Sequence, residues 1–271
     1  RQLADPSLAH VLLLAEGMHV DQAALVHGMN ETLGPGIGIT GGFAGDSVHF
    51  RRTLVLGDGV VGERRAVAVG LYGSSILVGY GTLGGWDPFG PARLVTRSAG
   101  NVAYEMDGEP ALDIYARYLG EDAPALPASA LRFPFSMRVP GRPGEVVRTV
   151  CAVDWNEKSL TFPGDVPEGA TLRMLRANVE RLIDAASTAA TVSTARLPGT
   201  RAEFAMLVSC VGRKLLMGQH VDEEVECVRA ILGRDAVCAG FYSYGEVAPL
   251  VPNSPAALHN QTLTITTFAE R

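Results

Sequence analysis

The chain has 271 residues, of which 47% are hydrophobic and 19% are charged, and its mean hydropathy is +0.15. A chain of this composition can bury a sizeable core, which excludes disorder of the whole chain, and its length predicts two domains of ~130 residues. Lys and Arg number 23 against 29 Asp and Glu, so the net charge is −6, the wrong sign for neutralising many phosphates. Nucleic acid is therefore not an expected partner.

The apolar runs are short of the ~20 residues that a membrane helix needs, so no membrane partner is expected. The chain opens at Arg1 without a leader pattern, which favours a trimmed, cytoplasmic chain with residues missing upstream. Its cysteines are too widely spaced for a zinc knuckle or a redox pair, which favours reduced, buried thiols. The four cysteines are Cys151, Cys210, Cys227 and Cys238.

The first elements of the chain form one predicted strand–helix unit. Ala9–Ala15 is typical of a buried strand. Asp21 is a typical N-cap, and apolar residues then recur at helical spacing up to Leu33. Gly34 is expected to end this helix.

From Gly36 to about Met106 the sequence changes to short runs rich in Val, Leu, Ile, Tyr and Gly, which predict a largely antiparallel meander. Gly-Asp-Gly at 57–59 and Gly-Ser-Ser at 73–75 are typical of hairpin turns. The predicted strands are Gly36–Thr40, Thr53–Leu56, Ala66–Tyr72, Ile76–Tyr80, Leu94–Ser98 and Val102–Met106.

Pro110 introduces a predicted helix over Ala111–Leu119, and we expect the domain boundary close to it, with domains 1–107 and 108–271. Strands and helices then mix without strict alternation. This order favours an α+β fold of mixed, largely antiparallel sheets with flanking helices, in two domains, over a doubly wound parallel sheet. After a Pro-rich loop at 120–130, the predicted strands are 131–139, 146–154, 159–162, 170–175, 203–209, 235–242 and 261–268, and the predicted helices are 176–195, 212–217 and 221–232.

Three possible catalytic or metal-binding motifs do not meet their structural requirements. The run Gly36–Gly41 has the letters of a dinucleotide-binding motif, but it follows a helix and leads into a strand. Ser243 resembles a nucleophile elbow, yet Phe241 stands where that motif needs glycine. No two histidines have zinc-binding helical spacing, and His220 with the acidic residues after it resembles a solvated helix start.

Three clusters nevertheless resemble the FIST family, named from F-box and intracellular signal transduction. They are 41–46 (GGFAGD), 209–213 (SCVGR), and the pair 240–246 (GFYSYGE) with 258–262 (LHNQT). The segment 101–119 is similar to the join between the N-terminal and C-terminal modules of the family. The resemblance covers essentially the whole chain, which looks N-terminally shortened beside the family pattern.

The resemblance implies a sensory module of signal transduction that binds a small ligand, with amino acids or related metabolites as ligands, and without catalysis. It also implies a signalling partner such as a histidine kinase. One alternative is a haem protein that senses nitric oxide. Another is an enzyme in which Cys210 is a low-pKa nucleophile and His259 its base. If upstream sequence is missing, an unpaired sheet edge could form a homo-oligomer.

Residue chemistry places the candidate ligand site in the C-terminal module. Arg213, at the start of a helix, could bind a ligand carboxylate, or it could be a surface residue of a strand–helix turn. Tyr242 and Tyr244 share one face of a strand and, with Glu246, suit a ligand ammonium group, or they are packing residues. Asp46 is expected to bond loop N–H groups. The candidate ligand-binding residues are Ser209, Cys210, Arg213, Tyr242, Tyr244, Glu246, His259 and Asn260.

Overall fold

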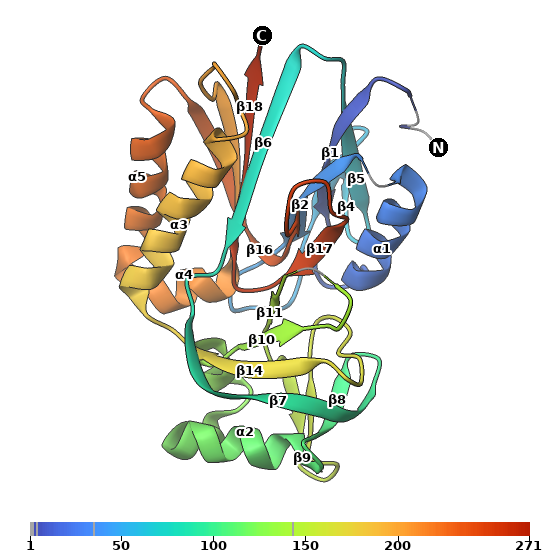
Figure 1. Ribbon diagram of the computed structural model, residues 1–271, viewed down its shortest axis with the longest axis vertical. Coiled ribbons are helices and arrows are strands. Elements are labelled where there is room, and N and C mark those ends of the chain that lie inside the picture. The colour runs from blue at the N-terminus through green and yellow to red at the C-terminus, as the bar shows by residue number, and fades with distance from the viewer. Residues whose placement is uncertain (1–2, 4, 35, 143) are drawn as a thin grey trace. The chain divides into compact units, whose positions relative to one another are not determined.

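The computed structural model describes residues 3, 5–34, 36–142 and 144–271. The fold is α+β with mixed sheets, and the chain forms two compact units (Figure 1). Unit 1 consists of Arg1–Gly85 and Val179–Arg271, and unit 2 consists of Trp86–Asn178. None of the helices in the described residues has the length and apolar character needed to cross a membrane.

Unit 1 is built on one curled sheet with the strand order β5-β1-β2-β16-β15-β18-β6, and β17 pairs with β16. β1 runs parallel to β2, β15 runs parallel to β16, and the other pairs are antiparallel. The edges of this path are β5 and β6, so β1 is paired on both sides. The strands are β1 (Leu8–Ala15), β2 (Gly38–Ala44), β5 (Ala66–Tyr72), β6 (Ile76–Leu83), β15 (Phe204–Cys210), β16 (Val237–Pro249), β17 (Ala256–His259) and β18 (Leu263–Glu270).

One hydrogen bond shows how strongly this sheet curls. The hydroxyl of Thr266 on β18 donates to that of Thr40 on β2 over 2.8 Å, although β16 and β15 lie between these strands in the sheet order. Neighbouring strands are ~4.8 Å apart, so a flat sheet would separate β2 and β18 by roughly 14 Å. The inner face of unit 1 is therefore closed enough for side chains from distant strands to meet.

In the described part of unit 1, four α-helices flank the sheet. In α1 (Gln22–Leu33), Asp21 accepts a hydrogen bond from the Ala24 N–H over 2.9 Å, and Gly34 forms the C-cap. α3 (Val179–Thr194) lies on β6, with α5 (Val221–Leu232) beside it (Figure 1). A side chain at Gly81 would place its Cβ 2.3 Å from the Ala189 carbonyl oxygen, so glycine allows α3 to approach the strand. The short helix α4 (Val211–Met217) follows β15.

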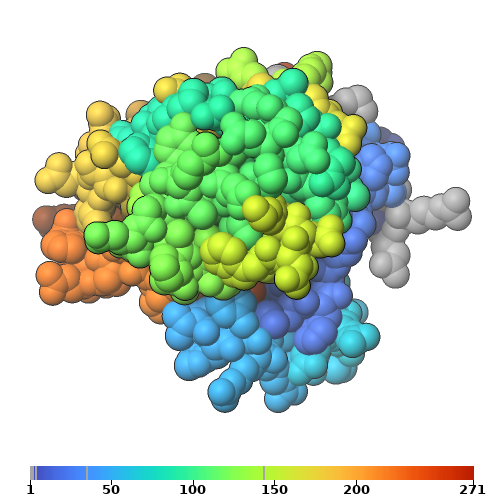
Figure 2. Space-filling view, turned by 90° about the horizontal axis from the view of Figure 1, so that it is seen from below, coloured from blue at the N-terminus to red at the C-terminus, as the bar shows by residue number. Residues whose placement is uncertain are grey.

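Unit 2 packs an antiparallel sheet, with the order β11-β10-β14-β7-β8-β13-β12, against α2 (Ala111–Leu119). Its fully buried core includes Leu112, Tyr115 and Phe162. Its residues form the continuous green-to-yellow body of Figure 2. The strands are β7 (Asp87–Ala99), β8 (Val102–Met106), β9 (Glu109–Pro110), β10 (Phe135–Arg138), β11 (Val146–Arg148), β12 (Ala152–Asp154), β13 (Ser159–Thr161) and β14 (Thr171–Arg176).

The predicted meander is wrong in its pairing. The turn at 57–59 does join the hairpin of β3 (Val55–Gly57) and β4 (Val60–Gly62), as predicted. Gly73, however, donates its N–H to the Ser7 carbonyl over 2.8 Å and so extends the pairing of β5 with β1. β5 and β6 therefore pair with strands far away in sequence, not with each other. The predicted loop at 120–130 also differs, because it contains two 3₁₀ helices, Gly120–Ala125 and Ala128–Arg132.

Candidate functional site

All eight candidate ligand-binding residues lie in unit 1, around the carboxyl end of β15. Cys210, the last residue of that strand, pairs with Ser243 of β16. Its N–H also donates to the carbonyl of Thr262, over 3.0 Å. Glu246 pairs with His259 of β17. The curled sheet thus brings together segments that are widely separated in the sequence.

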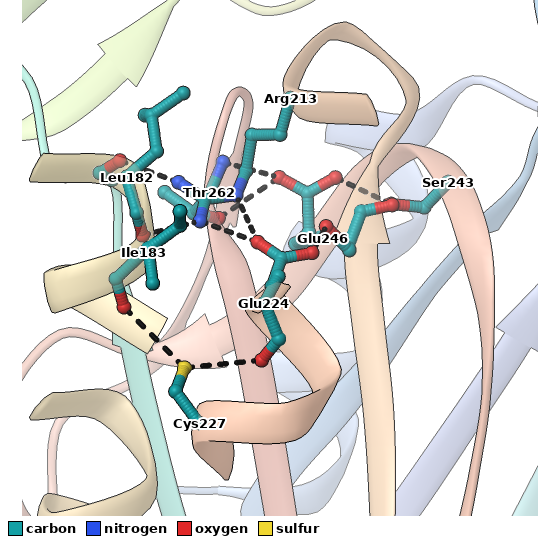
Figure 3. A network of polar contacts seen from close by, with 10 residues as sticks. Leu182, Ile183, Arg213, Glu224, Cys227, Ser243, Glu246 and Thr262 are labelled. Carbon is teal, nitrogen blue, oxygen red and sulfur yellow. Dashed lines mark hydrogen bonds and ion pairs between the residues drawn. The ribbon is translucent and has the colours of Figure 1, made fainter. Parts of the chain in front are cut away.

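Arg213 lies fully buried in α4, and its guanidinium is bound by the protein itself (Figure 3). Its Nε donates to Glu224 Oε1 over 2.9 Å, and its Nη2 to the same oxygen over 2.5 Å. Its Nη1 donates to the Gly84 carbonyl over 2.5 Å, and its Nη2 also donates to the Leu182 carbonyl over 2.9 Å. The carboxylate that this fork binds is thus Glu224, where the sequence predicted a ligand, and a ligand at Arg213 would have to displace Glu224.

Glu224 is the residue that the sequence analysis missed. The acidic residues after His220 predict a solvated helix start, yet Glu224 is only 2% exposed and also accepts a hydrogen bond from Ser209 Oγ over 2.8 Å. Its buried neighbours on α5 are Val228 and Leu232. Positions four residues apart share one face of a helix, so the spacing 224, 228, 232 is the signal that places Glu224 on the buried side.

Glu246 is fully buried and lies within a chain of hydroxyl groups (Figure 3). Oε2 accepts from the N–H of Thr262 over 3.1 Å and from its hydroxyl over 2.9 Å, while Oε1 lies 2.5 Å from Ser243 Oγ. Ser243 Oγ is also 3.1 Å from the Ser209 carbonyl oxygen. Burial raises the pKa of Glu246 to about 7 despite these hydrogen bonds.

A bulge in β16 changes which side chains share a face. The pairing of β16 with β2 shifts register between Ser243 and Gly245. One inserted residue reverses the alternation of a strand, so Glu246 reaches the side of Ser243. The predicted arrangement of both tyrosines with Glu246 around one ammonium group therefore does not form.

The two tyrosines have different partners. The Lys214 Nζ lies 4.5 Å from the ring centroid of Tyr242. Tyr244 stacks on Phe50, with ring centroids 4.7 Å apart, and its hydroxyl donates to Asp46. Burial, together with this carboxylate, raises the pKa of Tyr244 to about 12.

Asp46 organises the loop after β2, as the sequence predicted. Its carboxylate accepts hydrogen bonds from the backbone N–H groups of Phe50, Arg51 and Arg52 over 2.8–2.9 Å. The N–H of Arg52 and the hydroxyl of Tyr244 hold the pKa of Asp46 well below its ordinary value. This carboxylate is a fixed negative charge beside Tyr244.

The Cys210 thiol does not have the low pKa that a nucleophile would need. Burial and the neighbouring Glu246 raise the pKa of the Cys210 thiol, whereas a nucleophile would need it lowered. We expect iodoacetamide at neutral pH to label the exposed Cys151 well before Cys210, whose labelling should follow unfolding. Peptide mapping of a labelling time course measures this order. Rapid labelling of Cys210 in the folded protein would support the enzyme alternative instead.

Two buried amide oxygens lie against the dipeptide Tyr244–Gly245. Asn260 donates weakly to the Tyr244 carbonyl over 3.5 Å, and a Cβ at Gly245 would lie 2.4 Å from Gln22 Oε1. Among the described residues, neither Asn260 Oδ1 nor Gln22 Oε1 receives a hydrogen bond. Buried acceptors are normally satisfied, so these two oxygens, next to neighbouring residues of β16, are candidate acceptors for the donors of a ligand.

Two family domains match this chain. The FIST N domain matches residues 1–109, and the FIST C domain matches residues 111–249. The chain belongs to the FIST family. The comparison with curated proteins gives no match. FIST domains are sensory domains of signal transduction, which indicates ligand sensing.

The site combines both FIST domains with a segment that follows them. Gln22 and Asp46 lie in the FIST N match, and the candidate residues 209–246 lie in the FIST C match. His259 and Asn260 follow the matched segments. Compact unit 1 therefore takes chain from both domain matches, and the FIST N and FIST C segments are not the same division of the chain as units 1 and 2.

Proposed function

We propose that this FIST protein is a cytoplasmic sensory module that binds an amino acid or a related small metabolite at the Tyr244–Gly245 site without transforming it. The observation that carries the proposal is the pair of buried amide oxygens, Asn260 Oδ1 and Gln22 Oε1, that receive no hydrogen bond among the described residues. An ammonium group supplies several N–H donors and can satisfy acceptors of this kind.

The charges near the site support a cationic group on the ligand. Asp46 is an ionised carboxylate that bonds Tyr244. Gly17 packs against Tyr244, because a Cβ there would lie 3.1 Å from the Tyr244 ring, and Glu16 precedes it. Although burial opposes this, hydrogen bonds from Thr53 and from the N–H groups of residues 18 and 19 lower the pKa of Glu16. Two carboxylates thus favour an ammonium group at this end of the sheet.

A thermal-shift screen against amino acids and related metabolites tests the function. A ligand that binds only the folded state stabilises it by ~2.7 kcal/mol at a hundred times its dissociation constant. The corresponding acids that lack the amino group serve as controls for the ammonium group. Stabilisation by these acids alone, or by no member of the panel, would contradict an amino-acid ligand.

Asn260→Leu tests the site itself. We expect a loss of at least about tenfold in affinity, whereas the free energy of unfolding changes by less than about 1 kcal/mol, because the lost oxygen has no donor and the lost N–H bond is weak. Isothermal titration and urea unfolding measure the two quantities.

Asn30→Leu is the matched control. The Asn30 amide is fully used, since it donates to the Ala256 carbonyl over 2.8 Å and accepts from the Ala256 N–H over 2.9 Å. This substitution should cost about 1–3 kcal/mol of stability and leave the affinity of the folded protein unchanged. If Asn260→Leu behaved like Asn30→Leu, Asn260 would be structural and the site would lie elsewhere.

The buried histidines do not fit the haem alternative. An axial haem ligand presents a ring nitrogen to iron. His259 Nε2 instead donates to the Ala248 carbonyl over 3.0 Å, and His10 Nε2 lies 2.8 Å from the hydroxyl of Thr40. The visible absorption spectrum after addition of haemin tests this directly.

The proposed sensory role also requires a signalling partner, such as a histidine kinase.

A further inference from the structure

A cavity lies in unit 1, at the amino ends of β1 and β2, where His10 pairs with Gly38. The Tyr244–Gly245 site is at the other end of these strands, because Phe43, the partner of Gly245, pairs with the last residue of β1. The volume of the cavity is about 310 Å³. Liquid water occupies ~30 Å³ per molecule, so the cavity has room for a ligand of about ten non-hydrogen atoms.

The lining combines an apolar wall with positive charge. Ile76 and Val78, which share one face of β6, form an apolar wall, and Tyr80 and Arg196 contribute an aromatic ring and a guanidinium. None of the described residues that line the cavity is acidic. In a chain with a net charge of −6, this lining favours an anion with an apolar body.

Arg196 is held in place without an ion pair. Its guanidinium carbon lies 3.9 Å from the centroid of the Tyr80 ring. No carboxylate of the described residues forms an ion pair with it, whereas Arg52, Arg97 and Arg138 each pair with a Glu side chain. Stacking on an aromatic face leaves the N–H groups at the edge of the guanidinium available for a carboxylate.

His10 supplies a buried polar group to the same cavity. The ring is 2% exposed, and its Nε2 lies 2.8 Å from the hydroxyl of Thr40. Thr40 accepts from Thr266, so its own proton is free to be donated to Nε2, and in that arrangement the neutral ring carries its proton on Nδ1. Nδ1 lies beside Gly38, where a Cβ would approach it to 2.7 Å, so glycine keeps this donor uncovered.

We propose that this cavity binds a small monocarboxylate with an apolar body. Arg196 binds the carboxylate, His10 adds a neutral donor, and the apolar wall on β6 contacts the body of the ligand. This second site is independent of the proposed amino-acid site, since the two share no residue.

The test is isothermal titration with 4-methylbenzoate, and with 4-methylbenzamide as its uncharged counterpart. We expect the carboxylate to bind and the amide not to bind. Arg196→Gln should raise the dissociation constant at least about tenfold, whereas the control Arg234→Gln, which removes the same charge at an exposed position outside the cavity, should leave it unchanged.

Imidazole nitrogen NMR of the labelled protein locates the probe. The signals of His10 should shift on addition of 4-methylbenzoate and those of His259 should not, and Asn260→Leu should retain this binding. Equal binding of the amide, unchanged affinity in Arg196→Gln, or binding that leaves the His10 signals in place would each overturn the proposal. Inorganic phosphate is titrated in the same way. Binding of phosphate together with no binding of 4-methylbenzoate would also overturn the proposal.

Discussion

Glu224→Ala is expected to lower the free energy of unfolding by about 3–5 kcal/mol, the largest effect among the substitutions considered. The substitution removes the carboxylate that binds two nitrogens of Arg213 and leaves the guanidinium buried, since the exposed fractions of the two side chains are 0% and 2%. Ser209 Oγ loses the same partner. Urea unfolding at neutral pH measures the change.

Glu223→Ala provides a matched control on the preceding residue of α5. The Glu223 side chain is 54% exposed, and its ion-pair partner His220 is 47% exposed. An exposed pair of this kind contributes little, so we expect a change within about 0.5 kcal/mol. Replacing Arg213 and Glu224 together by Met should recover part of the loss, because no uncompensated charge remains. Equal effects of the two alanine substitutions would show that burial of the Arg213–Glu224 pair does not matter for stability.

Glu246→Gln is expected to change the pH dependence of stability on the order of 3 kcal/mol. The pKa of Glu246 is raised from 4.5 to about 7 in the folded protein. Its contribution to stability is therefore fully present below pH ~4.5 and is lost as the pH rises through about 7. Gln has no such titration, and its amide N–H can donate to the Ser243 hydroxyl, whose own proton can then go to the Ser209 carbonyl. The variant should thus gain stability relative to the parent between pH 4.5 and 8.

The buried His10 titrates over an overlapping pH range, so the pH profile of Glu246→Gln has to be compared with that of the parent protein. Burial lowers its pKa from 6.5 to about 4, so its contribution is present above pH ~6.5 and is lost as the pH falls through about 4. The two groups act with opposite sign over overlapping pH ranges and partly cancel in the parent. Urea unfolding at several pH values should show stability rising with pH in Glu246→Gln and falling in His10→Gln. Parallel pH profiles for the parent and Glu246→Gln would contradict the raised pKa.

The elements that could be predicted are those with a local cause. Asp21 and Gly34 bound α1 as expected, because a capping carboxylate and a terminal glycine act within a few residues of themselves. The helix Ala111–Leu119 and the hairpin at 57–59 follow from equally local signals. The candidate site residues could be gathered into one region because four segments resembled one family, and the structure places those segments around the end of β15.

Charge pairing and register could not be predicted in the same way. Nothing local to Arg213 indicates that Glu224 of the next helix, rather than a ligand, binds it. Nothing local to Tyr242 and Tyr244 indicates the bulge that moves Glu246 to the side of Ser243, because that register is set by β2, about two hundred residues earlier in the chain. Gln22 and Asn260 both lie next to Tyr244–Gly245 because of long-range strand pairing, and no spacing in the sequence connects them.

The sequence by itself determined that this protein is an α+β chain with a large core, where its capped helices begin and end, and which family it resembles, since composition, periodicity and capping depend on neighbouring residues. Tertiary structure alone decided that β5 pairs with β1 and β6 with β18, that Glu224 and Glu246 are buried, and that His10, Tyr80 and Arg196 meet around a cavity. The physical reason is that burial and strand pairing minimise the free energy of the whole sheet, so a residue's charge state and partners depend on segments far away in the sequence.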